Sequence, residues 1–289
     1  MPKCLAESEL ILTAKGRIYH LDLLPEELAD TIITVGDPDR VALVTRYFDT
    51  IETRVQHREL VTHTGILNGK RLSVVSTGMG TPNIDIVLNE LDALVNIDFQ
   101  TREIKSQLRS LKIIRVGTAG SLQADIPVGS FAATQVAVGL DNLMHFYRYS
   151  STPDELSMQE SLRHHLSAEC PTPYVVGGSD ALLSLFTPKA IPGITITCPG
   201  FYGPQDRHLR ATSLVSDLQQ QLSDWRFNGL RPINFEMETS AMYGLARCLG
   251  HEACSLSVLL ANRQTGEFVK DIGAAVDDLI QYTLSKLTA

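Results

Sequence analysis

Two arginines and their neighbouring glycines stand where predicted strands end, in positions suited to an anion. Gly36 and Arg40 follow one apolar run, and Arg115 and Thr118 close another. Open α/β sheets bind ligands at the carboxyl ends of their strands, and a guanidinium forms paired hydrogen bonds with an oxyanion. Together these residues suggest inorganic phosphate or a similar oxyanion. An ordinary strand-to-helix turn at Arg40 and an arginine–carboxylate bridge at Arg115 remain as alternatives.

A second glycine turn, S-T-G-M-G-T-P at residues 76–82, also leads from a predicted strand into a predicted helix. Asn83 replaces the third glycine of a dinucleotide fingerprint, and no G-K-S/T follows as in a P-loop. A helix start remains a plausible site for an anion or a hydroxyl group. Met79 is as well suited to core packing as to a pocket.

Aromatic and amide side chains in F-Y-G-P-Q-D-R, residues 201–207, have the chemistry to bind a planar base. Phe201 can stack on a ring, Gln205 can both donate and accept, and Arg207 can stabilise charge on a carbonyl oxygen. The alternative is a surface turn at the Gly-Pro corner. In N-F-E-M-E-T, Glu236 and Glu238 could bind sugar hydroxyls or simply interact with a helix dipole.

These residues need a scaffold, and the hydrophobic pattern supplies one. Apolar runs with strand character alternate with helical stripes, which indicates an α/β fold of one domain, residues 1–289. The strands are expected at Thr31–Val35, Leu72–Ser76, Lys112–Val116, Phe131–Val138, Thr195–Cys198 and Ser255–Leu260. The helices are expected at residues 84–95, 237–249 and 276–287, with Thr81 as a cap of the first and Gly250 ending the second. Residues 150–200 look least regular, and Leu182–Pro199 is interpreted as an insertion.

Composition narrows the function class. The chain has 289 residues, 25 Lys and Arg against 33 Asp and Glu, and a net charge of -8. Such an acidic chain is not expected to bind a nucleic-acid polymer. Five cysteines without a C-x-x-C pair argue against a disulfide framework, and no apolar run reaches the length of a membrane span. We expect a cytoplasmic protein with a small-molecule substrate.

Six short motifs in order make this chain similar to the nucleoside phosphorylase family, most closely to its uridine-specific members. They are V-G-D-P-D-R, H-R-E, S-T-G-M-G, R-V-G-T-A-G, F-Y-G-P-Q-D-R and N-F-E-M-E-T. The resemblance extends from Tyr19 to the C-terminal helix. It implies a mixed, twisted β-sheet flanked by helices, and a homo-oligomer built from dimers, commonly a hexamer. It also implies reversible phosphorolysis of uridine, with deoxyuridine as a further candidate substrate, to uracil and (deoxy)ribose 1-phosphate in pyrimidine salvage.

The resemblance implies a role for each matching residue. Phosphate would be held by Gly36, Arg40, Arg115 and Thr118, and by Arg58 of a neighbouring subunit. Ribose would be held by Met237 and Glu238, with Glu236 beside them and His20 of a neighbour at the 5′-hydroxyl. Uracil would be bound by Phe201, Gln205 and Arg207, under a closing loop that carries Arg263. Arg115, Gln205, Arg207, Glu238 and Arg263 would carry the catalysis.

Two positions favour a pyrimidine substrate. Purine-specific relatives have a proton-donating aspartate where this chain has Asn262, and they lack the Gln205/Arg207 pair. Nucleosidases lack the phosphate arginines. No organic cofactor is implied, with phosphate as co-substrate. Some relatives bind a monovalent cation between subunits near Glu59 and Met79, but Asn83 here replaces a serine that helps there. Three alternatives remain: a nucleoside phosphorylase of different or broader base specificity, a non-catalytic nucleoside-binding protein and a dinucleotide-binding protein.

Overall fold

Strands and helices alternate along residues 4–289, the part of the chain that the computed structural model describes. The strands are β1 Thr31–Val35, β2 Thr50–His57, β3 Leu60–Leu67, β4 Lys70–Ser76, β5 Ile97–Asp98, β6 Glu103–Ile104, β7 Lys112–Ser121, β8 Phe131–Gly139, β9 Tyr174–Gly177, β10 Ile191–Thr197, β11 Pro232–Glu236 and β12 Glu252–Asn262. The α-helices are α1 Pro38–Thr45, α2 Thr81–Asn96, α3 Pro153–His165, α4 Asp180–Phe186, α5 Leu218–Asp224, α6 Thr239–Leu249 and α7 Ile272–Leu287. Short 3₁₀ turns are η1 Pro25–Glu27, η2 Leu143–Phe146 and η3 Gly203–Gln205.

The main sheet is mixed and closes on itself at one end. Its order is β11-β10-β8-β12-β7-β1-β4-β3-β2, with β9 added beside β8. Strand β11 also pairs with β7 in antiparallel register, Asn234 opposite Ser121 and Phe235 opposite Gly120. Strands β7, β12, β8, β10 and β11 therefore form a ring of five, while β1 to β4 extend from it as an open sheet. The sequence did not predict this closure.

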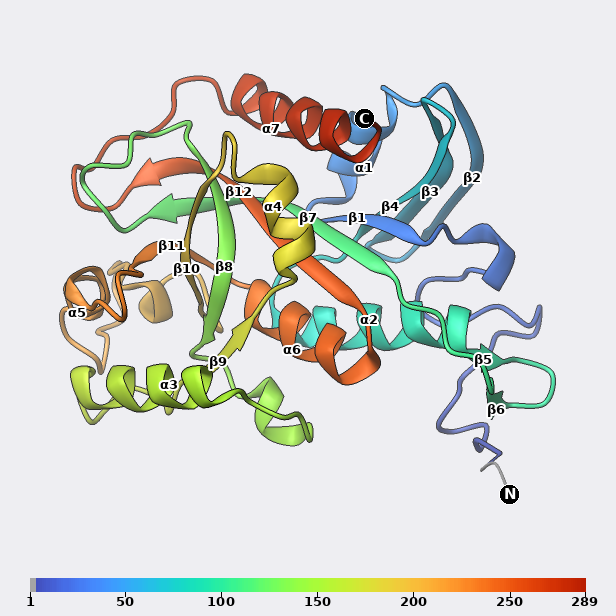
Figure 1. Cartoon of the computed structure of the whole chain (residues 1–289), viewed down its shortest axis with the longest axis horizontal. Helices are drawn as coiled ribbons and strands as arrows, with labels where there is room; N and C mark the ends of the chain where they lie inside the picture. Colours follow the sequence, from blue (N-terminus) through green and yellow to red (C-terminus); the bar gives the residue numbers. More distant parts are fainter. Residues whose placement is uncertain (1–3) are drawn as a thin grey trace.

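Helices cover both faces of the sheet (Figure 1), and each set packs on it through its own hydrophobic cluster. Apolar side chains of α1, α4 and α7 form one cluster with the strands, including Val41, Phe186 and Leu279. Those of α2 and α6 form another on the opposite face, including Leu88 and Leu245. Burying a large aliphatic side chain contributes roughly 1.5–3 kcal/mol, so these stripes fix each helix to its face of the sheet. The expected fold class, a mixed twisted sheet flanked by helices, is confirmed.

Most of the expected strands and helices are present, several with longer bounds. β2 was missed because its exposure alternates along an edge of the sheet, without an apolar run to mark it. The cap of α2 is Gly80, with φ of 90°, and not Thr81, which is already helical. Gly250 does end α6, with φ of 77° in the left-handed region.

Residues 150–200 are more regular than expected, because they contain α3, β9, α4 and β10. Within the stretch interpreted as an insertion, Ile191–Thr197 is strand β10, which pairs with β8 and β11 inside the ring. Whether this stretch is longer than in related proteins stays a prediction.

No helix between residues 4 and 289 combines the length and apolar character needed to cross a bilayer. The five cysteines are all free thiols.

Candidate active site

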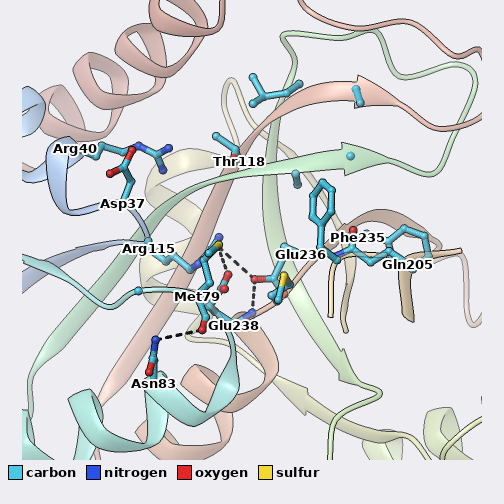
Figure 2. A pocket seen from close by; sticks show the side chains of 18 of the residues that line it. Asp37, Arg40, Met79, Asn83, Arg115, Thr118, Gln205, Phe235, Glu236 and Glu238 are labelled. Atoms are coloured by element: carbon cyan, nitrogen blue, oxygen red, sulfur yellow. Dashed lines mark hydrogen bonds and ion pairs between the residues drawn. The ribbon is translucent and has the colours of Figure 1, made fainter. Parts of the chain in front are cut away.

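A cavity of about 740 Å³ opens where the ring meets the open sheet. Its walls come from the β1–α1 turn, the β4–α2 turn, β7, the β11–α6 junction and the η3 loop (Figure 2). Most of the residues predicted for the site line it: Gly36, Arg40, Arg115, Thr118, Phe201, Gln205, Arg207, Glu236, Met237 and Glu238. His20, Arg58 and Arg263 do not line it. The structure thus brings together side chains that are up to about two hundred positions apart in the sequence.

One end of the cavity is cationic. Arg40 lies in the first turn of α1, whose N-cap Asp37 accepts a hydrogen bond from the Asp39 amide. Within residues 4–289 the Arg40 guanidinium makes no ion pair, and its hydrogen bond is to Val116 O, at 3.4 Å. Burial and the nearby charge of Arg115 lower the pKa of Arg40. A half-buried cation without a carboxylate partner is costly, and an anion in the cavity would offset that cost.

Arg115 is buried, with 6% of its surface exposed, and reaches the cavity across its own strand. A Cβ atom at Gly117 would lie 2.0 Å from Arg115 Nη1, so only glycine lets the guanidinium fold back over the backbone there. Arg115 Nη2 forms an ion pair with Glu238 Oε2 and lies 3.6 Å from Glu236 Oε2. The alternative of an arginine–carboxylate bridge is therefore present, and Arg115 lines the cavity as well.

Opposite charges partly offset the effect of burial on the pKa values in this cluster. Burial alone would lower the pKa of Arg115, but Glu238 and then Glu236 raise it above the ordinary value. Burial raises the pKa of Glu236, and Arg115 opposes that rise. One guanidinium thus serves two carboxyl groups, next to the Arg40 guanidinium, which makes no ion pair within residues 4–289.

The two carboxylates have different surroundings. Glu236 is enclosed by hydrogen bonds from Thr197 Oγ1 and from the backbone N–H groups of Glu238 and Thr239, and 1% of its side chain is exposed. Glu238 Oε1 accepts from Gly80 N at 2.7 Å, which ties the start of α6 to the β4–α2 turn. That link was not visible in the sequence, because the two residues are 158 positions apart.

The other end of the cavity is aromatic and cationic. The Arg207 guanidinium lies 3.9 Å from the centroid of the Phe201 ring, and its Nη1 donates to Phe201 O and to Gln205 Oε1 at 2.8 and 2.6 Å. Burial and the adjacent Arg263 lower the pKa of Arg207 to about 10, so the side chain is still a cation at neutral pH. Half of the Phe201 surface is exposed, which leaves the ring accessible for stacking.

Arg263 lies behind this loop rather than in the cavity. Its Nη1 and Nη2 donate to Gln205 O and Asp206 O at 3.1 and 3.2 Å. Asp206 has φ of 55°, a left-handed conformation that lets the chain turn between Gln205 and Arg207. Arg263 therefore supports the backbone that presents both of these side chains.

Some lining residues were not predicted. Phe235 is buried in β11, and Leu260 and Ala261 are partly buried near the end of β12, so their apolar types signalled only core packing. Met79 and Phe268 are largely exposed at the rim. For Met79, a pocket was one of the two alternatives expected from the sequence; for Phe268, a large apolar side chain in an exposed loop was the signal that could have identified it.

Asn262, which the resemblance aligned with an aspartate of purine-specific relatives, faces away from the cavity. Its Nδ2 donates to Gln123 O and Ile126 O at 3.0 Å each, and its Oδ1 accepts from the Gln264 and Thr265 amides. All of its hydrogen-bonding capacity shapes the loop after β12.

His20 and Arg58 form a separate patch with Tyr19 and His57. His20 Nδ1 lies 2.6 Å from Glu90 Oε1, and the Arg58 guanidinium lies 5.6 Å from the centroid of the Tyr19 ring. The neighbouring residue in sequence, Glu59, does line the cavity. The patch is thus beside the rim but does not reach into the cavity of its own chain.

The residues near which the resemblance placed a monovalent cation meet at the rim. Glu59 and Met79 line the cavity, and Asn83 Nδ2 donates to Met79 O at 3.2 Å (Figure 2). One chain supplies a single carboxylate here and a carbonyl that already accepts a hydrogen bond. A cation would therefore need oxygen atoms from a second chain.

Comparisons with known proteins agree with this architecture. The model of the phosphorylase superfamily matches residues 30–287. The uridine phosphorylase of Thermococcus kodakarensis is 30% identical over 89% of this chain and 82% of its own, and that of Escherichia coli is 28% identical over 88% and 89%. A DeoD-type purine nucleoside phosphorylase of Listeria monocytogenes is 27% identical over 86% and 88%.

Among solved structures, a Trypanosoma brucei nucleoside phosphorylase, described as showing uridine phosphorylase activity, superposes with a TM-score of 0.89. It is 30% identical and covers 96% of this chain and 99% of its own. The family match spans the ring, the open sheet and every wall of the cavity. The chain belongs to the phosphorylase superfamily.

Proposed function

We propose that this protein is a uridine phosphorylase. It would convert uridine, and deoxyuridine as a second substrate, with phosphate to uracil and (deoxy)ribose 1-phosphate. The observation that carries the proposal is the polarity of the cavity. Arg40 and Arg115 lie at one end and the Phe201–Gln205–Arg207 group at the other, with Glu238 between them. Sequence similarity to two uridine phosphorylases, over most of both chains, supports the proposal.

In this mechanism phosphate binds to Gly36, Arg40, Arg115 and Thr118 and attacks C1′ of the ribose. The bond from a phosphate oxygen to C1′ forms as the C1′–N1 bond breaks, and the electron pair stays on N1 of the base. Arg207 stabilises the negative charge that spreads over the leaving uracil, while Gln205 reads its amide edge. The catalytic work is orientation and electrostatics, with no covalent enzyme intermediate.

Ribose is assigned to Met237 and Glu238. Each oxygen of Glu238 accepts from one group, Gly80 N or Arg115, and keeps a lone pair for a sugar hydroxyl, whereas each oxygen of Glu236 already accepts two hydrogen bonds. Arg263 acts from behind the η3 loop, which carries Gln205 and Arg207. We propose no resident organic cofactor, and a monovalent cation only where two subunits meet at Glu59.

The location of the His20/Arg58 patch beside the rim supports a shared active site. We propose a homo-oligomer built from dimers, a hexamer, in which Arg58 completes the phosphate site of a neighbour and His20 reaches its ribose. A mixing experiment tests this. Inactive Arg58→Ala and Glu238→Gln proteins, unfolded and refolded together, should regain activity because some sites then receive intact residues from both chains. No recovery in verified mixed oligomers would contradict the shared site.

The free thiols suit a reducing compartment, and we propose a cytoplasmic role in pyrimidine salvage. The first experiment measures uracil release from uridine with and without phosphate, beside inosine and thymidine. Phosphate-dependent release from uridine is expected. Preference for inosine would favour the purine alternative, and binding without release from any nucleoside would favour a non-catalytic binding protein.

A further inference from the structure

Two buried threonines of β10 face polar side chains of β11 in the same way. The register pairs Thr195 with Asn234 and Thr197 with Glu236. Thr195 Oγ1 lies 2.9 Å from Asn234 Oδ1, and Thr197 Oγ1 lies 2.5 Å from Glu236 Oε1. Only the second pair ends at the cavity, because Glu236 is among its lining residues and Asn234 is not.

The direction of the Thr197 hydrogen bonds follows from its partners. Its oxygen accepts the Ser240 backbone N–H at 2.9 Å, and a backbone N–H can only donate. The Thr197 hydroxyl therefore donates its hydrogen bond to Glu236, which is the one of these two partners that can accept it. Ser240 is held in turn by its own hydroxyl, which donates to the buried carboxylate of Asp141 at 3.0 Å.

Glu236 uses the orientation that Thr197 gives it to cap α6. The N-cap of this helix, Glu238, has no side-chain hydrogen bond of its own to the helix start. Glu236 Oε2 instead accepts the N–H groups of Glu238 and Thr239, both at 2.9 Å. The first N–H groups of a helix need such partners when they are buried. The same carboxylate lies 3.6 Å from Arg115.

We propose that Thr197 is a positioning residue of the active site: by orienting Glu236, it holds the start of α6 and the Arg115 guanidinium, and so places Glu238 against the ribose. The inference rests on the proposed function only in naming ribose as the ligand of Glu238. The substrate itself does not contact Thr197, which does not line the cavity.

The test compares three variants of β10. Thr197→Val removes the hydroxyl at nearly constant volume, and Thr197→Ser keeps it. Thr195→Val removes the equally buried hydroxyl of the other threonine, which faces Asn234. Hydrogen bonds to charged groups are among the stronger ones, so kcat/KM for uridine should fall about tenfold to a hundredfold in Thr197→Val. Thr197→Ser and Thr195→Val should stay within about threefold of the wild type. Thr197→Ala, made in parallel, removes the same hydroxyl without placing a methyl group against Glu236.

Backbone amide exchange separates positioning from catalysis. In Thr197→Val the amides of residues 238–240 should exchange faster, while Thr195→Val leaves them protected. This readout does not need turnover, so it tests the positioning even if the wild type fails to phosphorolyse any nucleoside. The latter result would reject the proposed function alone.

A double-mutant cycle completes the test. If Thr197 acts through Glu236, Thr197→Val should add little to the loss already caused by Glu236→Gln. Additive losses would overturn the inference, since the two residues would then act independently. It would equally be overturned by unchanged exchange and turnover in Thr197→Val, by a similar loss in Thr195→Val, or by failure of Thr197→Ser to restore activity.

Discussion

The two arginines at the cationic end of the cavity should differ sharply when each is replaced by methionine. Both Arg115→Met and Arg40→Met remove a cation from the proposed phosphate site, so both should lose phosphorolysis. Only Arg115 also pairs with buried carboxylates, Glu238 directly and Glu236 at 3.6 Å. Arg40 makes no ion pair within residues 4–289. Loss of activity should therefore come with loss of stability in one variant and without it in the other.

The magnitude follows from the charges left behind. Leaving a buried charge without its partner costs about 3–5 kcal/mol, whereas removing an unpaired cation at Arg40 should change the free energy of unfolding by less than about 1 kcal/mol. For turnover, losing one charge-assisted contact to phosphate worth about 3 kcal/mol reduces kcat/KM by about a hundredfold or more.

The stability loss of Arg115→Met should depend on pH in a defined direction. Burial already raises the pKa of Glu236, and Arg115 is the main influence opposing that rise. Without Arg115 the native state holds a proton that the unfolded state releases near pH 4–5. Stability of the variant relative to the wild type should therefore fall as pH rises from 5 to 8, by about 1.4 kcal/mol per unit of added pKa shift.

Urea unfolding at pH 5.5 and pH 8 measures the free energy of unfolding of each variant, and phosphorolysis assays with uridine measure its kcat/KM. The wild type and Arg40→Met provide the two controls. Equal stability of Arg115→Met and wild type at pH 8, or a deficit that is the same at both pH values, would refute the argument that Arg115 compensates the buried carboxylates.

Other substitutions test separate parts of the site. Arg207→Ala should raise the KM for uridine more than that for phosphate, because its proposed partner is the base; steady-state kinetics with each substrate varied would reveal an equal loss instead. Gly117→Ala should reduce kcat/KM by at least tenfold, since the new methyl group occupies the space of the Arg115 guanidinium, and a normal rate would exclude that crowding. Thr152→Ala breaks the capping box of α3 and should cost about 1 kcal/mol in urea unfolding while leaving turnover unchanged.

Local patterns predicted the elements well where burial is one-sided and continuous. The stripe from Ile84 to Val95 marks α2, and Gly250 marks the end of α6. Each of these signals is contained in a short stretch of sequence, so it can be recognised without the rest of the fold. The edge strand β2 was missed, since its exposed residues alternate with partly buried ones and form no apolar run. The cap of α2 was misplaced by one residue because a positive φ at Gly80 leaves no side-chain signature.

In the site, too, local motifs could be predicted from the sequence and contacts between distant segments could not. Motifs identified the residues of both ends of the cavity, because glycines, arginines and aromatic side chains at strand ends have few other uses together. Hydrogen bonds between distant segments could not be predicted. Those from Gly80 to Glu238, from Arg263 to the η3 loop and from Thr197 to Glu236 each join residues dozens to more than a hundred positions apart. Such contacts depend on how the sheet closes, which no local spacing records.

That closure has a consequence for how the protein acquires activity as it folds. The antiparallel contact between β11 and β7 joins residues more than a hundred positions apart, so forming it carries a large loop-closure entropy and comes late in folding. Glu236 and Arg115 lie on those two strands. During refolding, helical signal should therefore return before enzymatic activity does. Until the last pairing forms, the chain is a partly folded species with two unjoined strand edges, which makes this interval the one in which aggregation competes with folding.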